Sequence, residues 1–169
     1  MSQSIKTWQY VELDPIEIDK LKNAYLKLQP IHPHFFNTID IGIKEFMGME
    51  LVRTAIINAQ PMSIGQIHKD CRPINNILAI NIPLINCYDA KTYFWNTFED
   101  VNKILYTSSG VPFIEFSRSS CTKIDEFTLT RPVIFRTDIP HSVDNNSTNP
   151  RIAISLRFKE DPWHLVPYK

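Results

Sequence analysis

The sequence VIFRTDIPHSVDNNSTNPRIAISLRF occupies residues 133–158 and carries a short apolar run at each end. The two runs are separated by a segment rich in Pro, Asn, Asp and Ser, a pattern typical of two β-strands joined by turns. Similar runs precede this segment; they are LVRTAIINA (51–59), SIGQIHK (63–69), NILAINIPLI (76–85), TYFWNTF (92–98) and FIEFSRS (113–119). Short strands at this spacing predict a mainly-β protein, and we expect a jelly roll (double-stranded β-helix) whose core spans about residues 50–158.

A helical segment comes before the strands. Asp14-Pro15 supplies an N-cap acceptor followed by proline at the first helical position, and apolar residues then recur at helical spacing over 16–28. A second short helix is predicted over 34–47, ending near Gly48. We expect these N-terminal helices, within about 14–47, to pack on one sheet of a single domain covering residues 1–169.

Composition excludes several classes of protein. Lys plus Arg and Asp plus Glu both number 18, a balance that disfavours a dedicated nucleic-acid binder. The four glycines are too scattered to form a phosphate-binding loop, and the three cysteines include no CxxC pair. No apolar run approaches the roughly 18 residues that span a bilayer, and the N-terminus lacks an apolar signal core. We therefore expect a cytoplasmic protein with no membrane or nucleic-acid partner.

Three residues could hold a metal ion. In His68-Lys69-Asp70, positions two apart in a strand point to the same face, so His68 and Asp70 can reach one ion. His141, far along the chain, could supply the third ligand; two imidazoles and a carboxylate suit Fe(II). The alternatives are a surface strand end with an accidental acid and, for His141, a loop histidine beside Pro140.

Arg151 opens the last strand ten residues after His141. Arginine is the residue best suited to bind a carboxylate through paired hydrogen bonds, so Arg151 could hold an organic acid in the same pocket. The alternative is a solvated arginine at the start of a strand. Arg157 lies further along the same face.

The segments SIGQIHKDCRP, NNILAINIPL and VIFRTDIPHSVDNNSTNPRIAISLRF together resemble the Fe(II)/2-oxoglutarate-dependent oxygenases over about residues 50–158. The resemblance implies that His68, Asp70 and His141 hold Fe(II), that Arg151 binds the distal carboxylate of 2-oxoglutarate, and that O₂ takes the remaining position. It also implies oxidative decarboxylation to succinate and CO₂, usually with hydroxylation of a substrate.

Within that family the chain most resembles the aspartyl/asparaginyl β-hydroxylase-like branch. It departs from the aspartyl hydroxylases of that branch by supplying a carboxylate ligand, Asp70. The substrate class is therefore left open among a peptide, an amino acid and a small metabolite.

Other positions are weaker candidates. Asn81 lies where that branch places a polar co-substrate contact, and Ser155 shares a face with Arg151, although both could be ordinary strand residues. Arg72, Tyr93 and Trp95 are candidate substrate contacts; the alternatives are a solvated loop arginine and core aromatic side chains. Two other functions remain possible, a cupin-like metalloprotein that does not use 2-oxoglutarate and a jelly-roll binding module with no catalytic activity.

Overall fold

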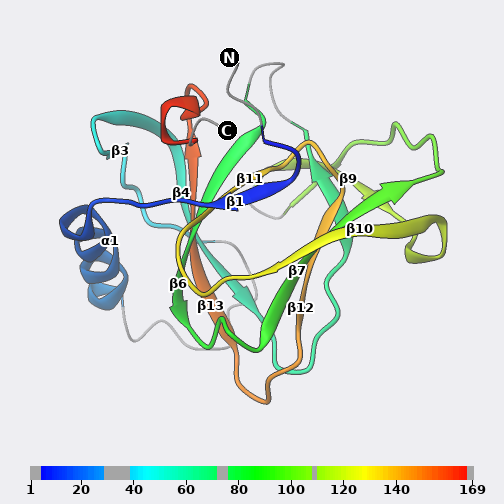
Figure 1. The fold of residues 1–169 in the computed structure, drawn as a ribbon, viewed down its shortest axis with the longest axis horizontal. Helices are drawn as coiled ribbons and strands as arrows, with labels where there is room; N and C mark the ends of the chain where they lie inside the picture. Colours follow the sequence, from blue (N-terminus) through cyan, green and yellow to red (C-terminus); the bar gives the residue numbers. More distant parts are fainter. Residues whose placement is uncertain (1–4, 29–38, 72–75, 108–109, 167–169) are drawn as a thin grey trace.

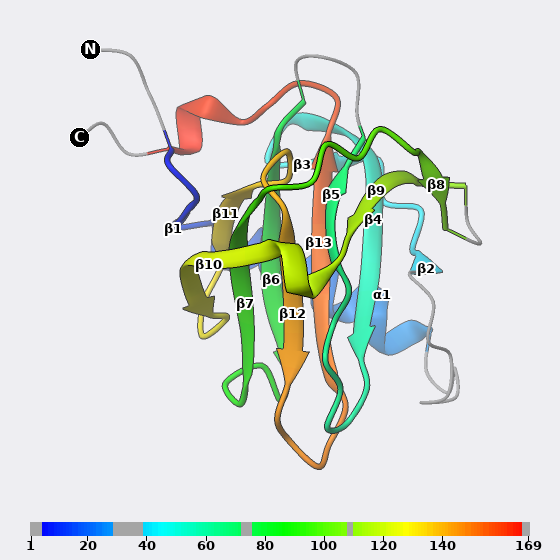
Figure 2. The same ribbon diagram turned by 90° about the vertical axis from the view of Figure 1, so that its right-hand side faces the viewer.

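The computed structural model describes residues 5–28, 39–71, 76–107 and 110–166. Two antiparallel sheets face each other across the molecule (Figures 1 and 2). The larger sheet has the order β1 (Trp8–Tyr10), β11 (Val133–Arg136), β6 (Leu78–Ile85), β13 (Arg151–Phe158), β4 (Met49–Ala59) and β2 (Ile39–Asp40), with β3 (Glu45–Phe46) paired to β4. The smaller sheet has the order β10 (Cys121–Thr128), β7 (Ala90–Thr97), β12 (His141–Asn145), β5 (Ile67–Asp70), β9 (Pro112–Phe116) and β8 (Leu105–Tyr106).

The strand order is that of a jelly roll. Strands β11, β6, β13 and β4 are neighbours in one sheet, and β10, β7, β12 and β5 are neighbours in the other. Along the chain these strands alternate between the sheets except at β7 and β10, so the last core strand, β13, returns to lie beside the first, β4. The predicted fold class, a mainly-β double-stranded β-helix, is confirmed.

The helix α1 (Pro15–Lys27) covers the outer face of the larger sheet, on the side away from the smaller sheet (Figure 1). The Asp14 side chain accepts a hydrogen bond from the Ile16 backbone N–H at 2.8 Å, and Pro15 occupies the first turn, as the sequence predicts. Leu21 is 1% exposed and packs in an apolar cluster with Ile154 and Leu156 of β13. Among the described residues, no helix has the length and apolar character needed to cross a bilayer.

The predicted second helix is wrong for residues 39–47, whereas 34–38 lie outside the described residues. This segment instead forms β2 and β3, both paired with β4. Met47 and Gly48 join β3 to β4 with φ angles of +51° and +74°. A two-residue turn with both φ angles positive matches the twist of a tight hairpin. The chain therefore reverses direction here between β3 and β4.

Most predicted strands are present with shifted ends. The run at 63–69 is extended only from Ile67 onward, and the run at 113–119 ends at Phe116 before a short 3₁₀ turn over Arg118–Ser120. The polar sequences of β10 and β12 carry little strand signal, and the sequence did not predict these two strands.

Side chains that alternate along β13 separate the core into two regions. Ile152, Ile154 and Leu156 face the helix side, where the first apolar cluster lies. Ala153 faces between the sheets, where it packs in a second cluster with Phe94 and Phe135. The remaining inward positions of β13, which are Arg151, Ser155 and Arg157, are polar and line a cavity between the sheets.

Candidate functional site

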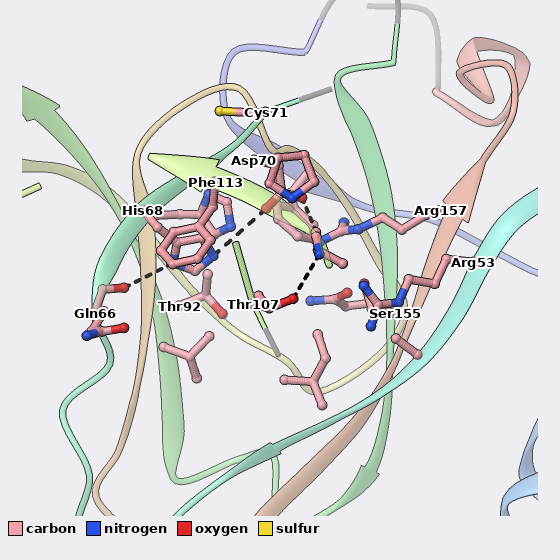
Figure 3. A pocket seen from close by; sticks show the side chains of 18 of the residues that line it. Arg53, Gln66, His68, Asp70, Cys71, Thr92, Thr107, Phe113, Ser155 and Arg157 are labelled. Carbon is pink, nitrogen blue, oxygen red and sulfur yellow. Dashed lines mark hydrogen bonds and ion pairs between the residues drawn. The ribbon is translucent and has the colours of Figure 1, made fainter. Parts of the chain in front are cut away.

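A cavity of about 630 Å³ lies between the two sheets. The smaller sheet contributes His68, Asp70 and His141 to its wall. Figure 3 shows His68 and Asp70 there. His68 and Asp70 are two apart on β5, so the period of the strand turns both side chains toward the cavity. The sequence-predicted pairing of these two residues on one face is therefore observed.

His141 reaches the same place through strand pairing. It is the register partner of His68 where β12 pairs with β5, and the two imidazole ring centroids are 4.6 Å apart. Nδ1 of His141 lies 2.8 Å from the Ile139 carbonyl, and Nδ1 of His68 lies 3.1 Å from the Gln66 carbonyl. A carbonyl accepts only from a protonated nitrogen, so these contacts assign the proton to Nδ1 and leave each Nε2 lone pair available to a ligand.

The Asp70 carboxylate completes this group. Its Oδ1 is 3.9 Å from His68 Nε2, and its Oδ2 forms an ion pair with Arg157 Nη2 at 3.1 Å. One potential ligand atom from each of His68, Asp70 and His141 lies within 4.8 Å of the others. Two ligands of one first-row metal ion are separated by at most about 4.6 Å, so small side-chain rotations suffice to bring all three onto one ion.

The electrostatics of the three residues suit a metal. Burial and the neighbouring His68 lower the pKa of His141 to about 3, so this imidazole is neutral at physiological pH. A neutral imidazole is the form that binds metal, and two imidazoles with one carboxylate form a donor set that fits Fe(II).

A buried cation occupies another part of the cavity. Arg151 is 1% exposed, and Nε, Nη1 and Nη2 of its guanidinium have no hydrogen-bond partner. The Cys87 thiol lies nearby but donates to the Ile152 carbonyl at 3.1 Å. Burial lowers the pKa of Arg151, yet an arginine remains charged at any physiological pH. A buried guanidinium with no partner is costly, and an anion in the cavity would relieve that cost.

Two more orphaned polar atoms line the same cavity. Asn81 on β6 and Ser155 on β13 are register partners, and both line the cavity. Asn81 Oδ1 and Ser155 Oγ are buried without a hydrogen-bond partner. The structure thus brings the predicted co-substrate contacts Arg151, Asn81 and Ser155 into the same cavity as the predicted metal ligands.

No model of a known protein family matches this sequence, and no curated protein matches it. Among solved structures, the chain is similar to AviO1 from Streptomyces viridochromogenes Tue57, with a TM-score of 0.49 and 11% identity over 96% of this chain and 92% of AviO1. It is also similar to a prolyl-4-hydroxylase from Pseudomonas putida, with a TM-score of 0.41 and 12% identity over 91% of this chain and 84% of that one. These likenesses concern the fold alone, and the fold assignment rests on the strand order described above.

Two of the predicted substrate contacts, Tyr93 and Trp95, do not line this cavity. Tyr93 and Trp95 alternate on β7 with the inward-facing Thr92 and Phe94, so they point to the outer face of the smaller sheet. There the Trp95 indole donates to Ser142 Oγ at 3.0 Å. The period of two that aligns Tyr93 with Trp95 also turns both side chains away from His141. Arg72 lies outside the described residues.

Two arginines line the cavity although the sequence pattern assigned them no role there. Arg157 contacts Asp70, and Arg53 on β4 lines the same cavity as the register partner of Arg157. Arg157 was detectable as a residue on the face of Arg151, six positions further on. Arg53 was not, because both faces of β4 mix apolar and polar residues, so alternation does not distinguish its inner side.

Proposed function

We propose that this protein is an Fe(II)- and 2-oxoglutarate-dependent oxygenase. The observation that carries the proposal is the combination in one cavity of a two-histidine, one-carboxylate group with a buried guanidinium that has no partner. Either feature alone fits several functions. Together they provide both groups that a metal-chelating dicarboxylate requires.

In this proposal each residue has a defined task. His68 and His141 present Nε2 to the metal because their Nδ1 atoms are held by backbone carbonyls, and Asp70 adds a negative charge. Arg157 holds the Asp70 carboxylate in place from the opposite sheet through its 3.1 Å ion pair. When bound, Fe(II) would activate O₂, the oxidant, with 2-oxoglutarate as the co-substrate that is oxidised to succinate and CO₂.

Arg151 is suited to hold the distal carboxylate of 2-oxoglutarate. Its guanidinium can form two parallel charge-assisted hydrogen bonds to a carboxylate, and Asn81 and Ser155 offer further polar contacts on the same wall. Because Arg151 is buried, these bonds form away from bulk water, where they are strongest.

The wall behind His141 is aromatic. Phe135 lies with its ring centroid 5.6 Å from the His141 ring, and Phe94 lies 6.3 Å from it. Both phenylalanines are buried, so this side of the site excludes water and fixes the orientation of the imidazole.

The substrate belongs to the proposal as well. A peptide, an amino acid or a small metabolite is compatible with the site, and the resemblance to the aspartyl/asparaginyl β-hydroxylase-like branch rests on sequence segments alone. The Asp70 carboxylate, which the aspartyl hydroxylases of that branch lack, argues against transferring their substrate to this chain.

A two-stage experiment tests the function. Under anaerobic conditions, calorimetric titration should show that 2-oxoglutarate binds only after Mn(II), a redox-stable substitute for Fe(II), has been added. With Fe(II) and O₂, the protein should then convert 2-oxoglutarate to succinate, faster with a substrate from a panel of amino acids and peptides. Metal binding without 2-oxoglutarate binding would favour the cupin-like alternative. Absence of metal binding would favour a non-enzymatic jelly roll.

A further inference from the structure

The cavity carries more positive charge than the proposed co-substrate can neutralise. Among the described residues that line it, Arg53, Arg151 and Arg157 are cations and Asp70 is the one acid. A divalent metal adds two further positive charges, and 2-oxoglutarate brings two negative ones. The filled site would therefore keep a net positive charge in a partly buried space, which is unfavourable without another anion.

The excess charge is concentrated at Arg157 and Arg53. These residues are direct register partners on β13 and β4, and both side chains extend into the cavity (Figure 3). Arg157 Nη2 is engaged by Asp70, whereas its Nη1 is buried without a hydrogen-bond partner. A buried N–H donor on a charged group is a strong site for an anion to bind.

The distal carboxylate of 2-oxoglutarate, held by Arg151, is not placed to satisfy this donor. In the proposed function, one carboxylate of 2-oxoglutarate goes to Arg151 and the other to the metal. Arg157 lies six residues beyond Arg151 on the same strand, which is about 20 Å between backbone positions at the usual rise. Arg157 contacts Asp70 and therefore lies at the metal end of the cavity. The metal-bound carboxylate would lie at this end too, but its single charge leaves the metal, Arg157 and Arg53 in excess over Asp70.

We propose that the substrate is a small carboxylic acid whose carboxylate is bound by Arg157 and Arg53. This inference rests on the proposed function and narrows its substrate class. A carboxylate has two oxygen atoms, one for each guanidinium. Because Arg157 also contacts Asp70, the bound acid lies beside the metal, with a nearby carbon presented for oxidation. The cavity of about 630 Å³ accommodates such a molecule together with 2-oxoglutarate.

Calorimetric titration of the protein loaded with Mn(II) and 2-oxoglutarate tests the inference. The probes are the twenty amino acids together with acetate, butyrate, hexanoate and benzoate, each compared with its neutral amide, and hexyl phosphate. At least one carboxylate should bind at least tenfold more tightly than its amide. Arg53→Gln should abolish that preference, because the neutral side chain provides no charge-assisted bond, and Arg53→Lys should restore part of it.

Arg131→Gln is the matched control. Arg131 lies outside the cavity, where it is 55% exposed and pairs with Glu12, so its replacement should leave the preference for carboxylates intact. The inference is wrong if amides bind as tightly as acids, if hexyl phosphate binds in place of the carboxylates, or if no carboxylate binds while 2-oxoglutarate still does. If 2-oxoglutarate itself does not bind, the proposed function fails instead.

Discussion

At the scale of single residues, the site depends on two imidazoles held in the same way. Both His68 and His141 direct Nδ1 to a carbonyl two residues earlier in the chain, Gln66 and Ile139 respectively. This arrangement fixes the tautomer before any metal arrives and removes an ordering cost from metal binding.

His141→Ala should abolish stoichiometric Fe(II) binding while leaving the β fold intact, because it removes one of three protein ligands. Metal analysis and circular dichroism of the purified variant measure both properties. His164→Ala, which replaces an exposed histidine outside the cavity, is the matched control and should bind metal normally. Full iron content in the His141 variant would remove His141 from the metal site.

Arg151→Ala should weaken 2-oxoglutarate binding, because the distal carboxylate would be buried without its cation. Losing one partner of such a pair costs about 2–5 kcal/mol, or roughly 30-fold to several-thousand-fold in affinity. Arg151→Lys should recover part of the loss, since the charge remains without the planar fork. Anaerobic titrations with Mn(II) and then 2-oxoglutarate measure both affinities; an unchanged 2-oxoglutarate affinity would contradict the role given to Arg151.

At the scale of secondary-structure elements, the position of β5 against β12 assembles the metal site. Gly65 leads into β5 where the two segments approach closely, and its N–H donates to Asp144 Oδ1 at 3.1 Å. A Cβ at this position would lie 2.3 Å from the Val143 carbonyl oxygen, so only glycine fits without moving backbone.

Gly65→Ala should therefore push β5 away from β12 and separate His68 from His141. We expect a loss of about 1–3 kcal/mol in the free energy of unfolding, typical of steric overpacking, together with weaker Mn(II) binding. Urea denaturation and calorimetry measure the two effects. Gly48→Ala is the control: it strains a turn at φ +74° and should lower stability without changing metal affinity. Normal metal affinity in the Gly65 variant would show that this close approach does not position His68.

Asn145, at the end of β12, joins several chain segments. Its buried amide donates to the carbonyls of Ala59, Gln60 and Asn149 at 2.9–3.1 Å, and its Oδ1 accepts from the Ser147 N–H at 3.1 Å. These bonds connect the end of β4, the end of β12 and the turn that leads to Arg151.

Asn145→Ala should lower the free energy of unfolding by about 3 kcal/mol, because it leaves buried backbone groups without partners. Chemical denaturation of the variant measures this change. Asn146→Ala, at the exposed neighbouring position, should change stability by less than about 0.5 kcal/mol. Equal effects of the two substitutions would mean that the buried bonds contribute little.

At the scale of the whole molecule, an ion pair in the cavity connects the two sheets. Asp70 on the smaller sheet pairs with Arg157 on the larger one, while the Arg151 guanidinium lies buried without a partner. Ligands that fill this space should therefore stabilise the entire jelly roll, since both sheets line it.

On protein saturated with Mn(II), 2-oxoglutarate at about 100 times its Kd should add about 2.7 kcal/mol, which raises Tm by about 5–10 °C for a chain of this length. Without Mn(II), 2-oxoglutarate should produce a much smaller shift. Glutarate, which has both carboxylates but lacks the 2-oxo group that chelates the metal, is the matched control ligand and should stabilise less. Thermal denaturation followed by circular dichroism measures the shifts; equal shifts with and without Mn(II) would contradict joint binding.

Local sequence patterns determined several of the strands, the start of the helix and part of the candidate metal site. The apolar runs predicted the strands β4, β6, β7 and β13, the Asp14-Pro15 pair predicted the start of α1, and the period of two placed His68 and Asp70 on one face. These features need only the geometry of neighbouring residues, because strand period and helix capping act over a few positions.

Tertiary structure alone decided the rest. The pairing of β12 with β5 sets His141 opposite His68, the pairing of β4 with β13 sets Arg53 beside Arg157, and the same packing turns Trp95 outward. It also made strands of residues 39–40 and 45–46, where a helix was predicted, because both pair with β4. Alternation tells which residues share a face of a strand. Which face is buried, and which strand lies beside it, depends on contacts between residues far apart in the chain.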